Sequence, residues 1–300
     1  MKNHLRSIAL VIFILLCFSA ISHAEIIRGD NGDKVNWTFN TITGEFSLFG
    51  SGTKWLSDST EMLPWNEYIP EIRSVHIASD VTYIGSWAFA GCSLLKEFIL
   101  PSSVTHVGIG LLYNCDGITE PVYNDSVFLF LPPSFAGPYI LPEGPRTVAG
   151  GALFGCKELT SLKIPETYTN IGDYAFSHCS NIMTVTIKGD LKEISDGAFE
   201  ECSNLKTIKL PDSITRIGAL AFSGCVTLTA FVVPKGTKEI GAKAFALCSA
   251  LNSIKFPSSL VKIEANAFTY CDELHSVNIP NAACKIERSS FPYHCTVTYK

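Results

Sequence analysis

From about residue 72 onward, apolar residues recur along the chain with a period of 23. A cysteine marks the period, with a phenylalanine three residues before it and a leucine three residues after it in most copies. The evenly spaced cysteines are Cys156, Cys179, Cys202, Cys225, Cys248 and Cys271, and Cys92 and Cys115 repeat the same step. A constant period of this length is typical of a repeat architecture in which one structural unit is copied along an axis.

Each repeat also carries the pattern of a short strand. Apolar residues alternate with polar ones in pairs such as Ile208/Leu210, and a proline such as Pro211 follows and ends the strand, because it lacks the amide hydrogen a ladder requires. A second apolar step and a glycine come next, and we expect a sharp turn into a short helical piece that carries Ala-Phe. One repeat is therefore predicted to form strand, turn, short strand and helical turn.

A single unit of this size cannot bury its own apolar row, so the units are predicted to stack into a right-handed solenoid with continuous ladders of Leu, Ile and Phe. We count nine coils, at residues 72–92, 93–115, 116–156, 157–179, 180–202, 203–225, 226–248, 249–271 and 272–295. The third coil is longer than the others, and its residues 121–145 are predicted to bulge out as an excursion rich in proline, glycine and aromatic side chains.

Both ends of a solenoid expose its core and need a cap. Residues 25–71 are predicted to cap the first coil with a hairpin, because apolar residues alternate on both sides of the turn sequence at residues 40–44. Trp55 and Trp65 are expected to help cover the core there. At the other end, residues 296–300 are predicted to add one edge strand.

Residues 1–24 have the pattern of a cleaved export signal. Lys2 and Arg6 precede an apolar run, and small residues lead to a cleavage site between Ala24 and Glu25. An uncleaved membrane anchor and lipid attachment at Cys17 are the alternatives, and the apolar run is shorter than the roughly 20 residues of a spanning helix. No later segment is apolar for long enough to span a bilayer, so we expect no transmembrane anchor after cleavage and a secreted or cell-surface protein.

Composition supports an ordered chain and disfavours some partners. The 300 residues are 47% hydrophobic and 17% charged, and the net charge is -5, which becomes more negative if Lys2 and Arg6 are removed with the signal. A chain without a basic surplus is a poor candidate for binding nucleic acid. We predict no nucleic-acid partner.

The repeat cysteines are predicted to be reduced and buried, because equivalent side chains in stacked coils lie about 4.8 Å apart and point the same way, whereas a disulfide needs two Cβ atoms turned toward each other. Cys284 and Cys295 lie off the ladder, and a bond between them is the main exception to consider. No metal-ligand spacing, nucleophile motif or phosphate loop is present, and the pairs His178-Cys179 and His294-Cys295 place neighbours that usually point apart. We expect no metal, cofactor or catalytic residue, and no enzyme.

A binding surface has more support in the sequence. The outward residues of the predicted strands form a row with lysine in every second coil, beside a second row of mostly small side chains; in order the first row includes Lys163, Thr186, Lys209, Val232, Lys255 and Asn278. Such a face suits an extended acidic or hydroxyl-rich partner, although short polar residues also occur where a sheet is merely solvated. The aromatic residues Tyr123, Phe135 and Tyr139 of the long coil form a second candidate site, or else pack locally.

The repeat C-x-x-L-x-x-I-x-L-P-x-S-I-x-x-I-G-x-x-A-F-x-x-C, as residues 202–225 display it, resembles the BspA-like class of leucine-rich repeats of bacterial and protist surface proteins. The sequences around Trp37, Gly44 and Trp65 also resemble the entry cap of that family. The resemblance covers residues 35–300 and implies a leucine-rich repeat solenoid that recognises an extracellular protein or cell-surface macromolecule, as in adhesion. The alternative is a carbohydrate-recognition accessory protein of a surface polysaccharide system, which would bind a glycan.

Overall fold

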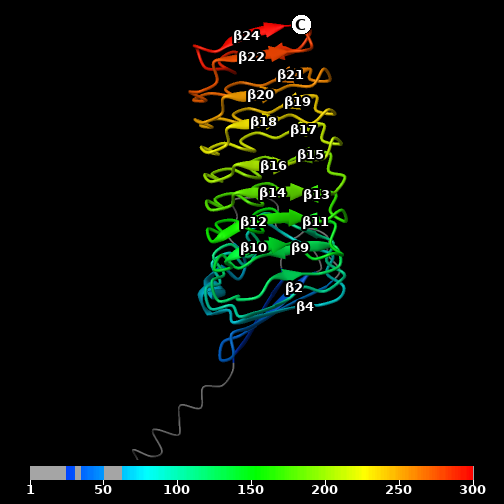
Figure 1. Cartoon of the computed structure of the whole chain (residues 1–300). Helices are drawn as coiled ribbons and strands as arrows, with labels where there is room; N and C mark the ends of the chain where they lie inside the picture. The colour runs from blue at the N-terminus through cyan, green and yellow to red at the C-terminus, as the bar shows by residue number, and fades with distance from the viewer. Residues whose placement is uncertain (1–24, 31–34, 51–62, 300) are drawn as a thin grey trace, which may run out of the picture.

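The computed structural model describes residues 25–30, 35–50 and 63–299, which form an elongated stack of coils (Figure 1). The predicted export signal at residues 1–24 and Trp55 lie outside the described residues. Within the described ranges, no helix has both the length and the apolar character needed to cross a bilayer.

The first strand of each coil contributes to one column of the stack. These strands are β4 (Ser74–Ile77), β6 (Glu97–Ile99), β10 (Gly137–Ile140), β12 (Leu159–Ile164), β14 (Thr184–Ile187), β16 (Thr207–Lys209), β18 (Ala230–Val232), β20 (Ser253–Lys255) and β22 (Ser276–Ile279). Neighbouring strands are parallel, for example β12 with β14 and β14 with β16. We call the outward side of β10 to β22 the A face.

The second strand of each coil forms a second column beside the first (Figure 1). It contains β5 (Tyr83–Ile84), β7 (His106–Val107), β9 (Val127–Phe130), β11 (Thr147–Val148), β13 (Asn170–Ile171), β15 (Glu193–Ile194), β17 (Arg216–Ile217), β19 (Glu239–Ile240), β21 (Lys262–Ile263) and β23 (Lys285–Ile286). The outward side of β13 to β23 is the B face. The turns that join each second strand to its cysteine form the third side, which we call the turn face.

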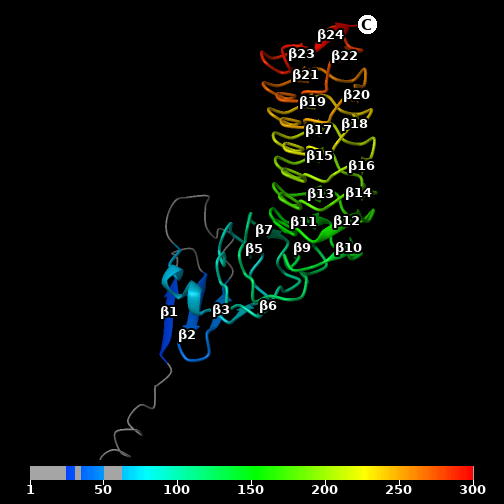
Figure 2. The same ribbon diagram turned by 60° about the vertical axis from the view of Figure 1, so that its left-hand side comes forward.

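The long stretch at residues 116–156 does not form an excursion, and the stack holds about ten coils rather than nine. Its β9 pairs in parallel with β11 and antiparallel with the short strand β8 (Val122–Tyr123), so it takes a place in the second column. Its β10 pairs with β12 in the first column. The extra coil joins β9 to β10 through residues 131–136 instead of a full turn-face segment, and Leu131 N donates to Ala152 O of the following coil at 2.8 Å. The axis of the stack bends in this region (Figure 2).

The segment carrying Ala-Phe forms hydrogen-bonded turns instead of a short helix. Two residues in most coils have positive φ, such as Tyr174 at 56° and His178 at 60°, and a left-handed residue interrupts helical backbone. Bonds from Ser177 N to Tyr174 O and from Cys179 N to Phe176 O, at 3.1 and 3.4 Å, close successive turns.

The repeat cysteines are buried free thiols, as predicted. From Cys115 onward, each donates its S–H to a backbone carbonyl of the preceding coil. The bonds Cys179 to Leu153, Cys202 to Phe176, Cys225 to Phe199, Cys248 to Phe222 and Cys271 to Phe245 span 3.1 to 3.3 Å. Burial raises the pKa of the Cys271 thiol to about 12. Cys284 and Cys295 are also free thiols, so the exception considered for them does not occur in the structure.

The phenylalanines form a second ladder through the core. Rings of successive coils stack with centroids 4.9 to 5.5 Å apart in the series Phe176, Phe199, Phe222, Phe245, Phe268 and Phe291. All but the last of these rings are fully buried. This continuous core sets the register of both faces.

The ends of the stack are covered by additional strands. The predicted hairpin is present, because β2 (Asn36–Asn40) pairs antiparallel with β3 (Glu45–Phe49), and β3 pairs in parallel with β4. β1 (Ile26–Asp30) adds a third strand, which pairs with β2. The 3-10 helix η1 (Asn66–Glu71) follows Trp65. The indole N–H of Trp65 donates to Ala88 O at 2.8 Å. At the far end, β24 (Thr296–Tyr299) pairs with β22.

Candidate binding surfaces

The A face brings the predicted row of outward residues into register. Lys163 lies opposite Thr186, and Thr186 opposite Lys209, while Val232 lies opposite Lys255 in the next pair of strands. Asn278 continues the row on β22 and donates to the Thr298 hydroxyl at 3.1 Å. Since the strands are about 4.8 Å apart, lysines in every second coil are separated by about 10 Å.

The A face from β12 to β22 has an unusual charge composition. Its twelve outward positions contain three lysines and no carboxylate; they are Ser161, Lys163, Thr184, Thr186, Thr207, Lys209, Ala230, Val232, Ser253, Lys255, Ser276 and Asn278. All three lysines are exposed, and none has an ion-pair partner among the described residues. This local surplus of positive charge lies in a chain whose net charge is negative.

The same row becomes apolar toward β10. Ile140 lies opposite Lys163 and is 59% exposed, and Ile99 on β6 is 50% exposed. Ile140 was predicted to lie in the excursion at residues 121–145, so its position in the row was not predicted. The only signal that identifies it is the alternation of residues 138–141 before Pro142, which matches the strand pattern of other coils.

The three aromatic residues of the long coil pack around one buried ring. Phe128 is fully buried and contacts Tyr123, at 5.9 Å between centroids, and Tyr139, at 6.1 Å. Phe135 meets Tyr139 edge to face at 4.8 Å, and both are partly buried against the core. Burial raises the pKa of Tyr139 to about 12. Only Tyr123 presents much of its side chain to solvent, and local packing accounts for the other two.

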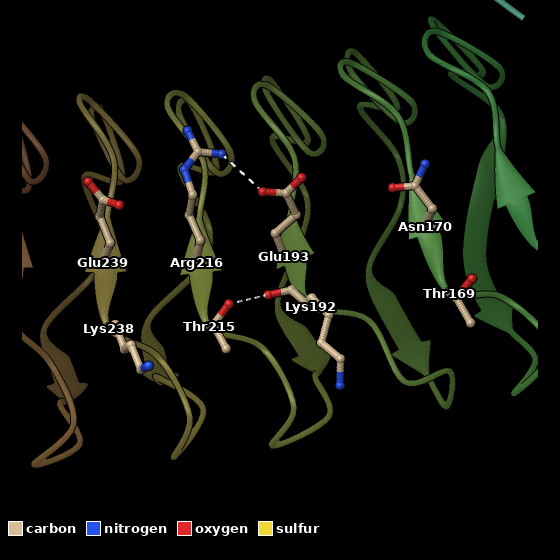
Figure 3. A pocket seen from close by; sticks show the side chains of 8 residues that line it. All are labelled: Thr169, Asn170, Lys192, Glu193, Thr215, Arg216, Lys238 and Glu239. Carbon is tan, nitrogen blue, oxygen red and sulfur yellow. Dashed lines mark hydrogen bonds and ion pairs between the residues drawn. The ribbon is translucent and has the colours of Figure 1, made fainter. Parts of the chain in front are cut away.

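The B face carries a polar groove of about 440 Å³ (Figure 3). Its side chains neutralise one another across coils. Arg216 bonds to Glu193 at 3.4 Å and to Asp196 at 2.9 Å, and the Thr215 hydroxyl donates to the Lys192 carbonyl at 2.9 Å. Further along, Lys262 pairs with Glu239 at 3.3 Å and also contacts Glu264 and Glu287. The groove therefore offers few uncompensated charges.

The two His-Cys pairs do not form nucleophile and base arrangements. Cys179 is fully buried and its Sγ bonds to Leu153 O, whereas the exposed ring of His178 packs on Phe154 at 5.1 Å between centroids. At the far end, His294 packs against His275 and Tyr293. Within the ranges the structure describes, no cluster of three or more His, Cys, Asp or Glu side chains is arranged to hold a metal ion.

Comparison with known proteins identifies the repeat. The family model described as BspA type leucine rich repeat region matches in six copies, over residues 67–138, 138–249 and 215–299. No curated protein matches the chain.

Two solved structures share the fold. A leucine-rich repeat protein from Bacteroides ovatus is 19% identical with a TM-score of 0.53, over 94% of this chain and 100% of that one. The pneumococcal vaccine antigen PcpA is 17% identical with a TM-score of 0.51, over 77% of this chain and 63% of that one. At such identities the similarity shows the fold alone, so the functional assignment depends on the surfaces described above.

Proposed function

Because the chain belongs to the BspA-type leucine-rich repeat family, we propose that it is a secreted or cell-surface protein that recognises an extracellular protein through its A face, without catalysis. Proteins built from these repeats generally serve as non-catalytic scaffolds that bind proteins. Export and a role in adhesion are parts of the proposal, and the signal-like residues 1–24 and the family support them.

One observation carries the proposal: three exposed lysines without ion-pair partners stand in register on a face whose outward positions from β12 to β22 have no carboxylate. Keeping like charges in one row costs free energy through repulsion, and nothing in the fold requires it. A partner with acidic groups would remove that repulsion and gain Coulomb energy, so the face is suited to an acidic protein segment.

The spacing of the lysines favours an extended segment. Consecutive lysines of the row are about 10 Å apart along the stack, and an extended chain in the polyproline II conformation rises about 3.1 Å per residue with three residues per turn. Acidic residues at every third position of such a peptide project from one side about 9 Å apart and therefore match the lysines. Thr186 and Val232, which lie between the lysines, are shorter than lysine and leave room for the peptide backbone to approach the sheet.

The experiment that tests the proposal compares two triple charge reversals. One variant combines Lys163→Glu, Lys209→Glu and Lys255→Glu. The matched control combines Lys238→Glu, Lys243→Glu and Lys285→Glu, which changes the net charge equally at lysines that lie on the B and turn faces. Binding is measured at physiological salt to immobilised matrix proteins, to a ten-residue peptide with glutamate at every third position and to a glycan array.

We expect saturable binding to a matrix protein or to the acidic peptide that falls at least about tenfold in the A-face variant and changes little in the control, since each close charge contact is worth a substantial part of 1 kcal/mol. Equal losses in both variants would mean that net charge alone drives binding. Binding confined to glycans and sensitive to Tyr123→Ala would favour the carbohydrate-recognition alternative instead.

A further inference from the structure

The turn face contains a pocket that is separate from the lysine row of the A face and from the polar groove of the B face. One position of the repeat has positive φ in every coil that has a turn-face segment, and its side chain points outward; it is occupied by Trp87, Gly110, Gly151, Tyr174, Gly197, Leu220, Lys243, Asn266 and Ser289. Gly110 and Gly151 are neighbours in this row, since Gly110 N donates to Gly150 O at 3.0 Å. Two adjacent coils without a side chain thus leave a gap between Trp87 and Tyr174.

The gap is open above Gly151. A Cβ at Gly110 would lie 2.3 Å from the ring of Trp87, so the indole leans over Gly110 and forms one wall. A Cβ at Gly151 would meet only the Gly110 backbone, at 3.6 Å, so no side chain fills the space there. The result is a pocket of about 410 Å³ with a glycine floor.

Aromatic rings form the walls. Tyr113 meets Trp87 edge to face at 5.7 Å between centroids, and Phe154 meets Tyr113 at 5.3 Å. Tyr174 closes the far side. Trp87 is 50% exposed and Tyr113 is 37% exposed. Leaving this much aromatic surface in water forgoes burial energy of about 25 cal/mol per Å², so the arrangement is not explained by stability.

Negative charge borders the pocket, although its wall is almost entirely apolar. Glu200 is the single charged residue that lines it, and no described cation lies within ion-pair distance of its carboxylate. The turn segments from residue 85 to residue 202 contain no lysine or arginine that could neutralise Glu200. Tyr174 and Glu200 line the same pocket, and partial burial together with the charge of Glu200 raises the pKa of Tyr174.

We propose that this pocket binds the cationic side chain of an arginine or lysine presented by a partner protein. A guanidinium or ammonium group against the aromatic rings of the pocket gains cation–π energy of about 0.5 to 2 kcal/mol. Glu200 lines the same pocket and accepts a hydrogen bond from the Ser177 hydroxyl, and its negative charge attracts the bound cation. A neutral sugar needs several converging polar groups, and the pocket offers only one charged side chain among rings and glycines.

This site is independent of the A face, because it lies on another side of the stack and selects the opposite charge. A partner that engages both surfaces would carry an acidic extended segment and a separate basic residue. Either site can therefore be lost in an experiment without the other.

Acetyl-arginine amide is the probe, with acetyl-citrulline amide as its neutral isostere, and binding is followed through the indole N–H resonance of Trp87 at pH 7.5. The wild-type protein is expected to bind the arginine compound saturably in the millimolar range and the citrulline compound at least about tenfold more weakly, since only the former can pair with a carboxylate. Glu200→Gln is expected to weaken arginine binding about tenfold. Glu201→Gln is its matched control, because Glu201 packs over Gly224 in the next coil.

A steric variant tests the pocket itself. Gly151→Leu places a side chain in the open space, at a position where Leu220 shows that leucine is compatible with the same backbone. It should abolish binding, whereas Asn266→Leu, which introduces leucine at an equivalent position far along the stack, should not. Far-UV circular dichroism verifies that the variants fold. If Gly151→Leu does not fold, the proposal is tested by comparing Glu200→Gln with Glu201→Gln and the arginine compound with the citrulline compound.

Three results would overturn the proposal. They are the absence of saturable arginine binding, equal binding of the citrulline compound, and binding of neutral cellotetraose that is lost in Gly151→Leu but kept in Glu200→Gln. The last result would identify a glycan site.

Discussion

The A face and the B face are built from the same repeats and the same core, yet they treat charge in opposite ways. On the B face, Arg216 and Lys262 each contact two or more carboxylates from neighbouring coils. On the A face, Lys163, Lys209 and Lys255 have no such partners among the residues described. Pairing across coils helps the stack hold together, and unpaired charge of one sign leaves the A face free to attract a partner.

This difference shows that the repeat alone does not define a surface. Outward positions of both strands tolerate many residues, because the buried ladders of Phe, Cys, Leu and Ile carry the fold. The choice of outward residues can therefore serve stacking on one face and binding on another.

The largest expected effect is a loss of stability at high pH, which would affect both faces because they share one core. Burial holds the pKa of Cys225 and Cys248 well above the ordinary value of 9.0. Above pH 9 the unfolded chain loses thiol protons that the folded chain keeps, so the free energy of unfolding falls as pH rises. The loss is about 1.4 kcal/mol for each such thiol by pH 10.

Urea unfolding between pH 8 and pH 10 measures this loss. The Cys225→Ala variant should show a smaller dependence on pH than the wild type. A free energy of unfolding that is constant over this range would contradict the buried thiol ladder.

A cavity in the core should weaken both faces nearly as much. Phe222→Ala removes a fully buried ring that stacks on Phe199 and Phe245, and it should reduce the free energy of unfolding by about 3 to 5 kcal/mol. Val232→Ala on the A face is the control, because that side chain is 68% exposed and should change stability by less than about 0.5 kcal/mol. Denaturant melts of both variants give the comparison, and similar losses in the two would argue against the described packing.

The two faces should differ when one cation is removed from each. Arg216→Met leaves Glu193 and Asp196 without their partner and should cost about 0.5 to 1 kcal/mol, a modest value because these groups are partly exposed to solvent. Lys209→Met leaves no carboxylate without a partner, so the free energy of unfolding should stay unchanged or increase slightly. Thermal melts at low and high salt test this, since salt should reduce only the effect of Arg216→Met. An equal cost for both variants would remove the distinction between the faces.

The smallest effect should come from extending the lysine row. Val232→Lys adds a cation between Lys209 and Lys255 and should tighten binding of the acidic peptide about two- to threefold, as expected for one more exposed charge contact. Val261→Lys, an exposed residue beside the B-face strand β21, adds the same charge elsewhere and should have little effect. Equal gains from both variants would indicate attraction by net charge.

Much of the fold could be predicted because its signals recur. The 23-residue spacing of the cysteines, the prolines after each first strand and the alternation of apolar residues predicted the coils, the reduced thiols and the register of the lysine row. The hairpin of β2 and β3 was predicted from local alternation around a turn sequence. In each case the contacts are between equivalent residues of adjacent repeats, so that position in the period implies position in space.

The stretch from Cys115 to Cys156 was misinterpreted because it has no internal marker of the period. It lacks a cysteine and an Ala-Phe pair midway, yet its backbone completes a coil: Ala149 N donates to Phe128 O at 2.9 Å, and Leu141 N donates to Lys163 O at 3.0 Å. Those bonds depend on the neighbouring coils, which provide a template for any chain of suitable length. The pocket at Gly110 and Gly151 was not predicted either, because these two glycines become neighbours only through the way this stretch is folded.

The sequence pattern predicts the solenoid, its core ladders and the outward row of the A face, since a strict period converts spacing along the chain into stacking in space. Which charges are paired, which aromatic rings are buried and where two glycines leave a pocket became visible in the folded chain alone. Those properties depend on side chains from different coils meeting across the stack. Their distances are set by how the long stretch at residues 116–156 is accommodated, and a one-dimensional pattern does not contain that information.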